Sequence, residues 1–69
     1  MKYICRIASN SSLGREYDVD TRSAMKCAEM FGRYEGGESV TVYNKSGRPL
    51  SRVLYSPEDG GGYYRVTID

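Results

Sequence analysis

The sequence predicts a small α+β fold with two layers, in which one amphipathic helix packs on an antiparallel sheet in the order ββαβββ. Two observations predict this fold. Apolar residues recur at helical spacing in one stretch, at Ala24, Cys27, Ala28 and Phe31. Elsewhere apolar and polar residues alternate, which is the pattern of half-buried strands. Because the chain has 69 residues, we expect a single domain, 1–69, that buries roughly 60% of its unfolded surface.

The first two predicted strands form a hairpin. The residues of 2–8 alternate, with Tyr3, Cys5 and Ile7 on one side. A polar cluster at 9–12 is typical of a turn, and the alternation resumes over 15–19.

The predicted helix follows this hairpin directly. Asp20 or Thr21 is expected to be its N-cap, because a side-chain oxygen there accepts a hydrogen bond from a free N–H of the first turn. Gly32 suits the left-handed position that ends many helices. We therefore expect a short helix with a close approach to the sheet at its two alanines.

A second hairpin is predicted over 38–55, and Asn44–Gly47 is typical of a type I turn closed by a left-handed glycine. With 45–47 as the loop, Val42 faces Leu50 and Thr41 faces Ser51. On this register Val40, Val42, Leu50 and Leu54 point toward the helix, whereas Thr41, Tyr43, Ser51, Val53 and Tyr55 point away. Arg52 then falls on the inner side, which indicates an edge strand, a bulge or a shifted register.

The last predicted strand follows a loop over 56–62 that is rich in glycine. Over 63–68, Tyr64, Val66 and Ile68 share the side predicted to face the helix. Tyr63 and Arg65 share the opposite side.

Composition narrows the classes of function. Ten Lys and Arg against nine Asp and Glu give a net charge of +1. So small a charge argues against strong electrostatic attraction of nucleic acid or of an anionic membrane. The N-terminal apolar run is interrupted too early for a signal peptide, and nothing is predicted to span a membrane, so we expect a cytoplasmic protein. In that compartment Cys5 and Cys27 are expected to be free, buried thiols.

Catalytic and metal chemistry are not predicted. The chain has no His, so Ser-His, Cys-His and His-metal mechanisms are excluded within it. Two thiols do not supply the four ligands of a structural zinc site. Glu16, Asp18 and Asp20 lack the spacing of a calcium loop. We predict a protein that is not an enzyme and has no cofactor.

Seven tyrosines and seven arginines are the unusual feature of the composition. Both types are enriched where proteins bind one another, although tyrosine also has a high strand propensity. The predicted facing places Tyr43, Tyr55, Tyr63 and Arg65 on the sheet side away from the helix, where they are the candidates for a partner-binding surface. Arg52 is added to this surface as a further candidate, although the register places it on the inner side.

Two functions are compatible with such a surface. The favoured one is a small binding module or inhibitor that docks on another protein or on a second copy of itself. In size and composition the chain is similar to short accessory proteins of bacteria and phages. The alternative is a single-stranded nucleic-acid-binding domain, with tyrosines stacked on bases and Arg48, Arg52 and Arg65 on phosphates.

Overall fold

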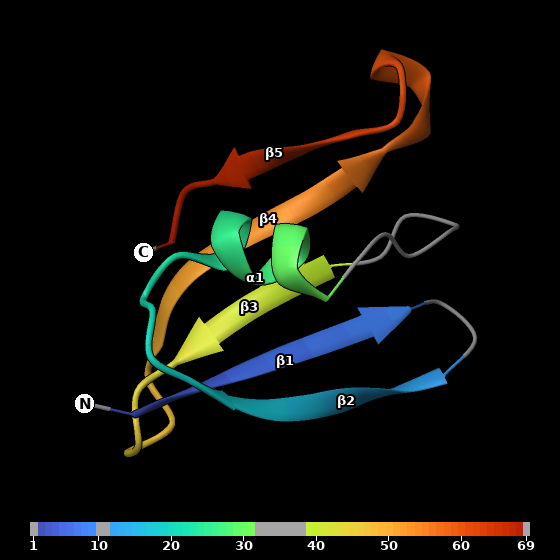
Figure 1. The fold of residues 1–69 in the computed structure, drawn as a ribbon. Helices are drawn as coiled ribbons and strands as arrows, with labels where there is room; N and C mark the ends of the chain where they lie inside the picture. Colours follow the sequence, from blue (N-terminus) through green and yellow to red (C-terminus); the bar gives the residue numbers. More distant parts are fainter. Residues whose placement is uncertain (1, 10–11, 32–38, 69) are drawn as a thin grey trace.

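The computed structural model describes residues 2–9, 12–31 and 39–68 and contains one α-helix on a five-stranded antiparallel sheet (Figure 1). The predicted order ββαβββ is confirmed. The elements are β1 (Tyr3–Ser9), β2 (Ser12–Val19), α1 (Ala24–Met30), β3 (Ser39–Tyr43), β4 (Pro49–Ser56), the 3-10 helix η1 (Pro57–Asp59) and β5 (Gly62–Val66).

The strands lie in the order β2-β1-β3-β4-β5, so β2 and β5 form the two edges of the sheet. Each of the four ladders is antiparallel. The helix lies across one face and packs on β3, β4 and β5 (Figure 1). The sheet therefore has one face toward α1, here called the helix face, and an opposite face that no described element covers, here called the open face.

The core lies between α1 and the helix face and consists of small and medium side chains. Its buried hydrophobic members are Cys5, Ile7, Val19, Ala24, Cys27, Ala28, Val40, Val42 and Val53. Because the two alanines have no bulk, the helix axis can approach the sheet closely. Beyond the helix, the ring of Phe31 stacks on that of Tyr17 with 4.2 Å between centroids.

The helix begins later than the sequence predicts. Its N-cap is Ser23, whose hydroxyl accepts a hydrogen bond from the backbone N–H of Lys26 at 3.2 Å. Thr21 instead accepts from the N–H of Ser23 at 3.1 Å, so its side chain shapes the turn before the helix. The predicted cap at Asp20 or Thr21 is wrong, and the predicted end at Gly32 lies outside the described residues.

The predicted turn between β3 and β4 is confirmed. The N–H of Gly47 donates to the carbonyl of Asn44 at 3.0 Å, and Gly47 has a φ of 91°, which favours glycine. The Asn44 side-chain oxygen also accepts from the N–H groups of Ser46 and Arg48, at 3.0 and 2.9 Å. One side chain thus organises the whole loop.

The predicted register beyond this turn is wrong by one residue. Tyr43 lies opposite Pro49 as expected, but the register then shifts, and Val42 lies opposite Ser51 rather than Leu50. Proline has no N–H for the ladder and is found in sheets at bulges, which explains an extra residue in β4 at this point. As a result Val53 faces α1 and is fully buried, whereas Leu54 lies on the open face.

The shift carries over to β5, because residues directly opposite in a ladder share a face. Arg65 pairs with Val53 and Tyr63 pairs with Tyr55, so all four lie on the helix face. Tyr64 pairs with Leu54 on the open face, together with Val66. The predicted facing of β5 is therefore reversed.

Candidate functional site

The structure divides the five residues of the predicted partner-binding surface between the two faces of the sheet. Tyr43 lies on the open face, as predicted. Arg52 also lies there, because the register shift beside Pro49 moves it from the inner side on which the predicted register placed it. Tyr55, Tyr63 and Arg65 lie on the helix face, because the bulge in β4 reverses the facing of both later strands. They do not form one surface.

A row of five residues crosses the centre of the open face, one from each strand in register. The row is Glu16, Arg6, Thr41, Arg52 and Val66, from β2 to β5. Thr41 at its middle is only 7% exposed, although the helix lies on the other side of the sheet. Arg6 and Arg52 therefore lie on either side of the buried Thr41.

The two arginines of this row are in different electrostatic surroundings. Arg6 forms an ion pair with Glu16 at 3.1 Å and lies over the ring of Tyr43, 5.9 Å from its centroid. Arg52 is exposed and forms no ion pair with another described residue. Its guanidinium is thus the more available of the two for an outside group.

Apolar side chains flank this charged row. Leu54 pairs with Tyr64 on one side of it, and Ile4 pairs with Tyr43 on the other. Tyr64 is 48% exposed. The open face therefore combines rigid apolar area with arginine donors, as protein interfaces do.

The tyrosines on the helix face have a structural role. The rings of Tyr55 and Tyr63 meet edge to face with 5.3 Å between centroids, a favourable geometry for aromatic pairs. Tyr63 also packs against the buried core. These two side chains extend the core beyond α1 toward the β4–β5 connection.

Four exposed arginines surround two neighbouring hollows at the end of β5. Arg22, Arg48 and Pro49 line one hollow of about 490 Å³. Arg52 and Arg65 line the other. Both hollows share Leu50 and Ile68, which are half-buried. We call these six residues, Arg22, Arg48, Arg52, Arg65, Leu50 and Ile68, the arginine edge.

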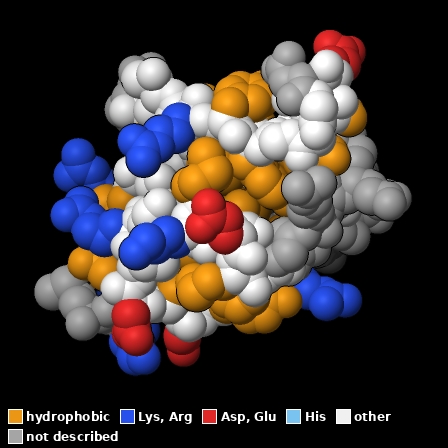
Figure 2. Space-filling view, turned by 45° about the horizontal axis from the view of Figure 1, so that its top comes forward, with side chains coloured by type: hydrophobic (Ala, Val, Ile, Leu, Met, Phe, Trp, Pro, Cys, Tyr) orange, Lys and Arg blue, Asp and Glu red, His pale blue; other side chains and the backbone are white. Residues whose placement is uncertain are grey.

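Figure 2 shows basic side chains gathered along the left side of the molecule, with hydrophobic side chains between them. Sequence reasoning selected Arg52 and Arg65 but not Arg22, Leu50 or Ile68. Arg22 precedes the helix and Ile68 follows β5, and only the tertiary fold brings them together. No local pattern in the sequence indicates this proximity.

Acidic residues gather at the opposite edge of the sheet. Glu16 and Asp18 belong to β2 and lie on the open face, opposite Arg6 and Ile4. Asp20 follows β2 and pairs with Lys2 at 3.1 Å. Glu16 and Asp20 are thus paired with basic side chains, whereas Asp18 forms no ion pair with another described residue.

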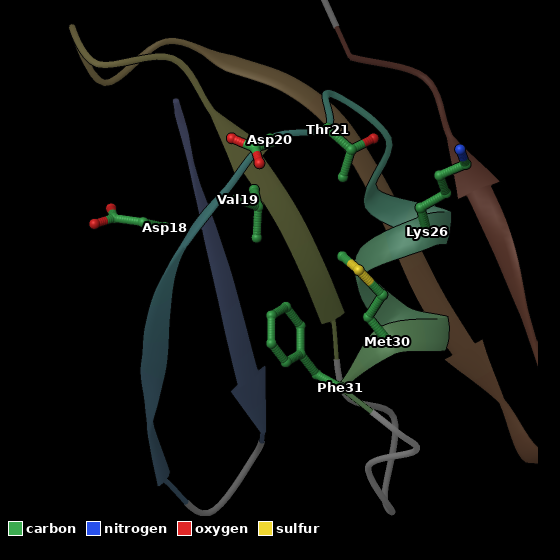
Figure 3. A pocket seen from close by; sticks show the side chains of 7 residues that line it. All are labelled: Asp18, Val19, Asp20, Thr21, Lys26, Met30 and Phe31. Atoms are coloured by element: carbon green, nitrogen blue, oxygen red, sulfur yellow. The ribbon is translucent and has the colours of Figure 1, made fainter. Parts of the chain in front are cut away.

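A separate groove of about 400 Å³ lies between the end of β2 and α1 (Figure 3). Val19, Met30 and Phe31 give it an apolar lining, and Met30 is 60% exposed. Asp18 points to the other side of β2, and Lys26 points away from the apolar side chains (Figure 3). The groove is thus a small apolar recess without a converging set of polar groups.

The two cysteines are free and buried, as predicted. Burial, together with a hydrogen bond and an electrostatic interaction with Cys27, raises the pKa of Cys5 to about 12. Burial also raises the pKa of Cys27. A thiol with a raised pKa is a poor nucleophile at neutral pH. Among the described residues, no three His, Cys, Asp or Glu side chains are grouped to hold a metal ion.

Comparison of the chain with protein-family models, curated proteins and solved structures finds no match in any of the three. No helix in the described ranges is long and apolar enough to cross a membrane.

Proposed function

We propose that this protein is a small, non-enzymatic binding module that docks on a partner protein through the open face of its sheet. The observation that carries the proposal is the half-exposed Tyr64, which lies beside Leu54 and next to the row that contains Arg52. Tyrosine and arginine are the residue types that anchor protein interfaces most often.

A non-catalytic role is supported by the chemistry of the described side chains. Both thiols are buried and have raised pKa values, so neither is poised as a nucleophile. The chain also lacks His, the commonest general acid and base. Free thiols fit a reducing compartment, which supports the cytoplasm as the place of action.

A single-stranded nucleic acid is the second candidate partner. It is favoured by Tyr64, whose exposed ring could stack on a base, and by Arg52 on the same face. Two features argue against it: Glu16 neutralises Arg6, and Asp18 adds a negative charge to the same face. A phosphate backbone that crosses the open face would be repelled at the β2 edge.

The test is affinity capture from the source cell at low and high salt, with and without nuclease, followed by mass spectrometry. Tyr64→Ala is compared with Met30→Ala, because Met30 is also exposed but lies on the helix layer. We expect a protein partner that is retained at high salt, lost with Tyr64→Ala and kept with Met30→Ala.

Other results would contradict the proposal. A partner that Tyr64→Ala retains as well as the unmodified chain does would show that the open face is not the interface. Material that disappears on nuclease treatment would support the nucleic-acid alternative.

A further inference from the structure

We propose that the partner places an acidic, extended segment with apolar side chains along the arginine edge. This inference rests on the proposed function and adds the chemistry of the partner to it. The carboxylates of the segment would bind Arg22, Arg48, Arg52 and Arg65, while an apolar side chain would contact Leu50 and Ile68.

The convergence of four arginines from separate parts of the chain is the first argument. Arg22 comes from the segment before α1, and Arg48 from the β3–β4 turn. Arg52 lies on the open face of β4, and Arg65 on the helix face of β5. All four are exposed, and no acidic residue lines either hollow among the described residues. Such a cluster favours an anion, because each guanidinium can bind a carboxylate with two parallel hydrogen bonds.

The position of Arg48 is fixed by the turn. Its N–H donates to the Asn44 side chain at 2.9 Å, and its carbonyl accepts from the N–H of Asn44 at 2.9 Å. The backbone at this arginine is therefore ordered before any ligand binds, which lowers the entropic cost of binding.

The shape of the edge favours an extended peptide. The ladder between β4 and β5 ends at the pair Arg52–Val66. The strand β4 itself begins three residues earlier, at Pro49. The part of β4 over 49–51 therefore extends past the last β5 pair. An extended peptide can lie along such an edge, with its alternate side chains toward the arginines and toward the apolar floor.

The apolar floor and the charge distribution favour a peptide over a nucleic acid. Leu50 and Ile68 line both hollows, so two apolar side chains lie among the arginines, and a phosphate backbone would not use them. Asp18, on the open face at the other edge, would repel a polyanion long enough to reach it. A short acidic segment matches the arginine edge without reaching β2.

The test is a titration followed by NMR, with the backbone and arginine Nε–H signals observed. The probe is a peptide of about ten residues that alternates Glu and Leu, and its matched control replaces each Glu by Gln. We expect the Glu peptide to shift the signals of the arginine edge, with weaker binding as salt increases, and the Gln peptide to leave them unchanged.

Charge-reversed variants locate the site. Arg48→Glu is expected to weaken binding of the Glu peptide at least about tenfold, because it replaces an attraction by a repulsion. Arg15→Glu is the matched control: Arg15 is an exposed residue of β2, at the far edge, and the change in net charge is the same. We expect it to bind the peptide as the unmodified chain does. If Arg48→Glu fails to fold, comparison of the Glu and Gln peptides on the unmodified chain still tests the proposal.

Three results would overturn the inference: equal binding of the Glu and Gln peptides, equal weakening by Arg48→Glu and Arg15→Glu, or tighter binding of an oligothymidylate of similar length at the same arginines. The last would assign the edge to nucleic acid. If the peptide does not bind but a captured protein depends on Tyr64, the partner chemistry is wrong and the proposed function stands.

Discussion

The rings of Tyr55 and Tyr63 meet edge to face across the β4–β5 ladder on the side of the sheet that carries α1. Tyr64, the next residue, points to the open face and is half-exposed. Neighbouring tyrosines of one strand thus have different roles, one in packing and one at the surface.

Replacing these two tyrosines should give unequal losses of stability. Tyr63→Ala removes the aromatic pair and a contact with the core, so we expect the free energy of unfolding to fall by about 2 kcal/mol, less than for a fully buried aromatic. Tyr64→Ala should cost less than about 1 kcal/mol. Urea unfolding of both variants measures the difference. A larger loss for Tyr64→Ala would mean that the faces of β5 are exchanged.

Gly14 is expected to resist substitution because β1 passes close to it. A Cβ at this position would lie 2.7 Å from the carbonyl oxygen of Ile7 and 3.0 Å from Cγ of Arg6. We expect Gly14→Ala to destabilise the protein by about 1 to 3 kcal/mol, as overpacking does. Gly62→Ala is the control, because a Cβ there meets nothing within 4 Å. Thermal unfolding should show a lower Tm for the first variant and little change for the second.

The buried thiols should make stability depend on alkaline pH. Cys5 has a pKa of about 12 in the folded protein against 9.0 for an unperturbed thiol, chiefly because it is buried. The unfolded chain therefore loses this proton first, and the contribution to stability is full below about pH 9 and is lost as pH rises toward 12.

Comparison with Cys5→Ala isolates this effect from the titration of lysines and tyrosines. The free energy of unfolding of the unmodified chain should fall more steeply between pH 9 and 12, by at most about 1.4 kcal/mol per pH unit for this group. Parallel curves for the two proteins would show that Cys5 does not stay protonated in the fold.

The start of α1 is tied to the sheet by Ser51. Its hydroxyl accepts a hydrogen bond from the N–H of Ala24 at 3.0 Å. Ser51→Ala leaves this N–H without that acceptor and should cost about 1 kcal/mol, whereas Ser51→Thr keeps the hydroxyl. Ser23→Ala removes the N-cap and should cost a similar amount. Hydrogen exchange of the helix amides measures both effects, and unchanged exchange in the alanine variants would contradict this role.

The elements that the sequence predicts well are those determined by nearby residues. The apolar spacing of Ala24, Cys27 and Ala28 predicts the buried face of the helix, and all three are buried. The Asn44 and Gly47 pair predicts the turn, because an Asn acceptor and a left-handed glycine are local requirements.

The facing of β4 and β5 could not be predicted in the same way. The alternation of 50–55 fits either register, since Val53 and Leu54 are both apolar. A bulge beside Pro49 decides between them, and the tyrosines and arginines of both strands change face with it. The arginine edge could not be predicted either, because it depends on the tertiary proximity of Arg22 and Ile68, which are far apart in the sequence.

The order of the strands also bears on how the chain folds. Among the described strands, three of the four ladders join neighbours in the sequence, whereas the ladder of β1 with β3 joins strands separated by another strand and the helix. Closing that ladder carries the largest loop-closure entropy, so we expect its formation to be the slow, long-range step of folding. The chain therefore consists of a hairpin, β1–β2, and a meander, β3–β4–β5, and the pairing from Ile4–Tyr43 to Ala8–Ser39 joins them into one sheet.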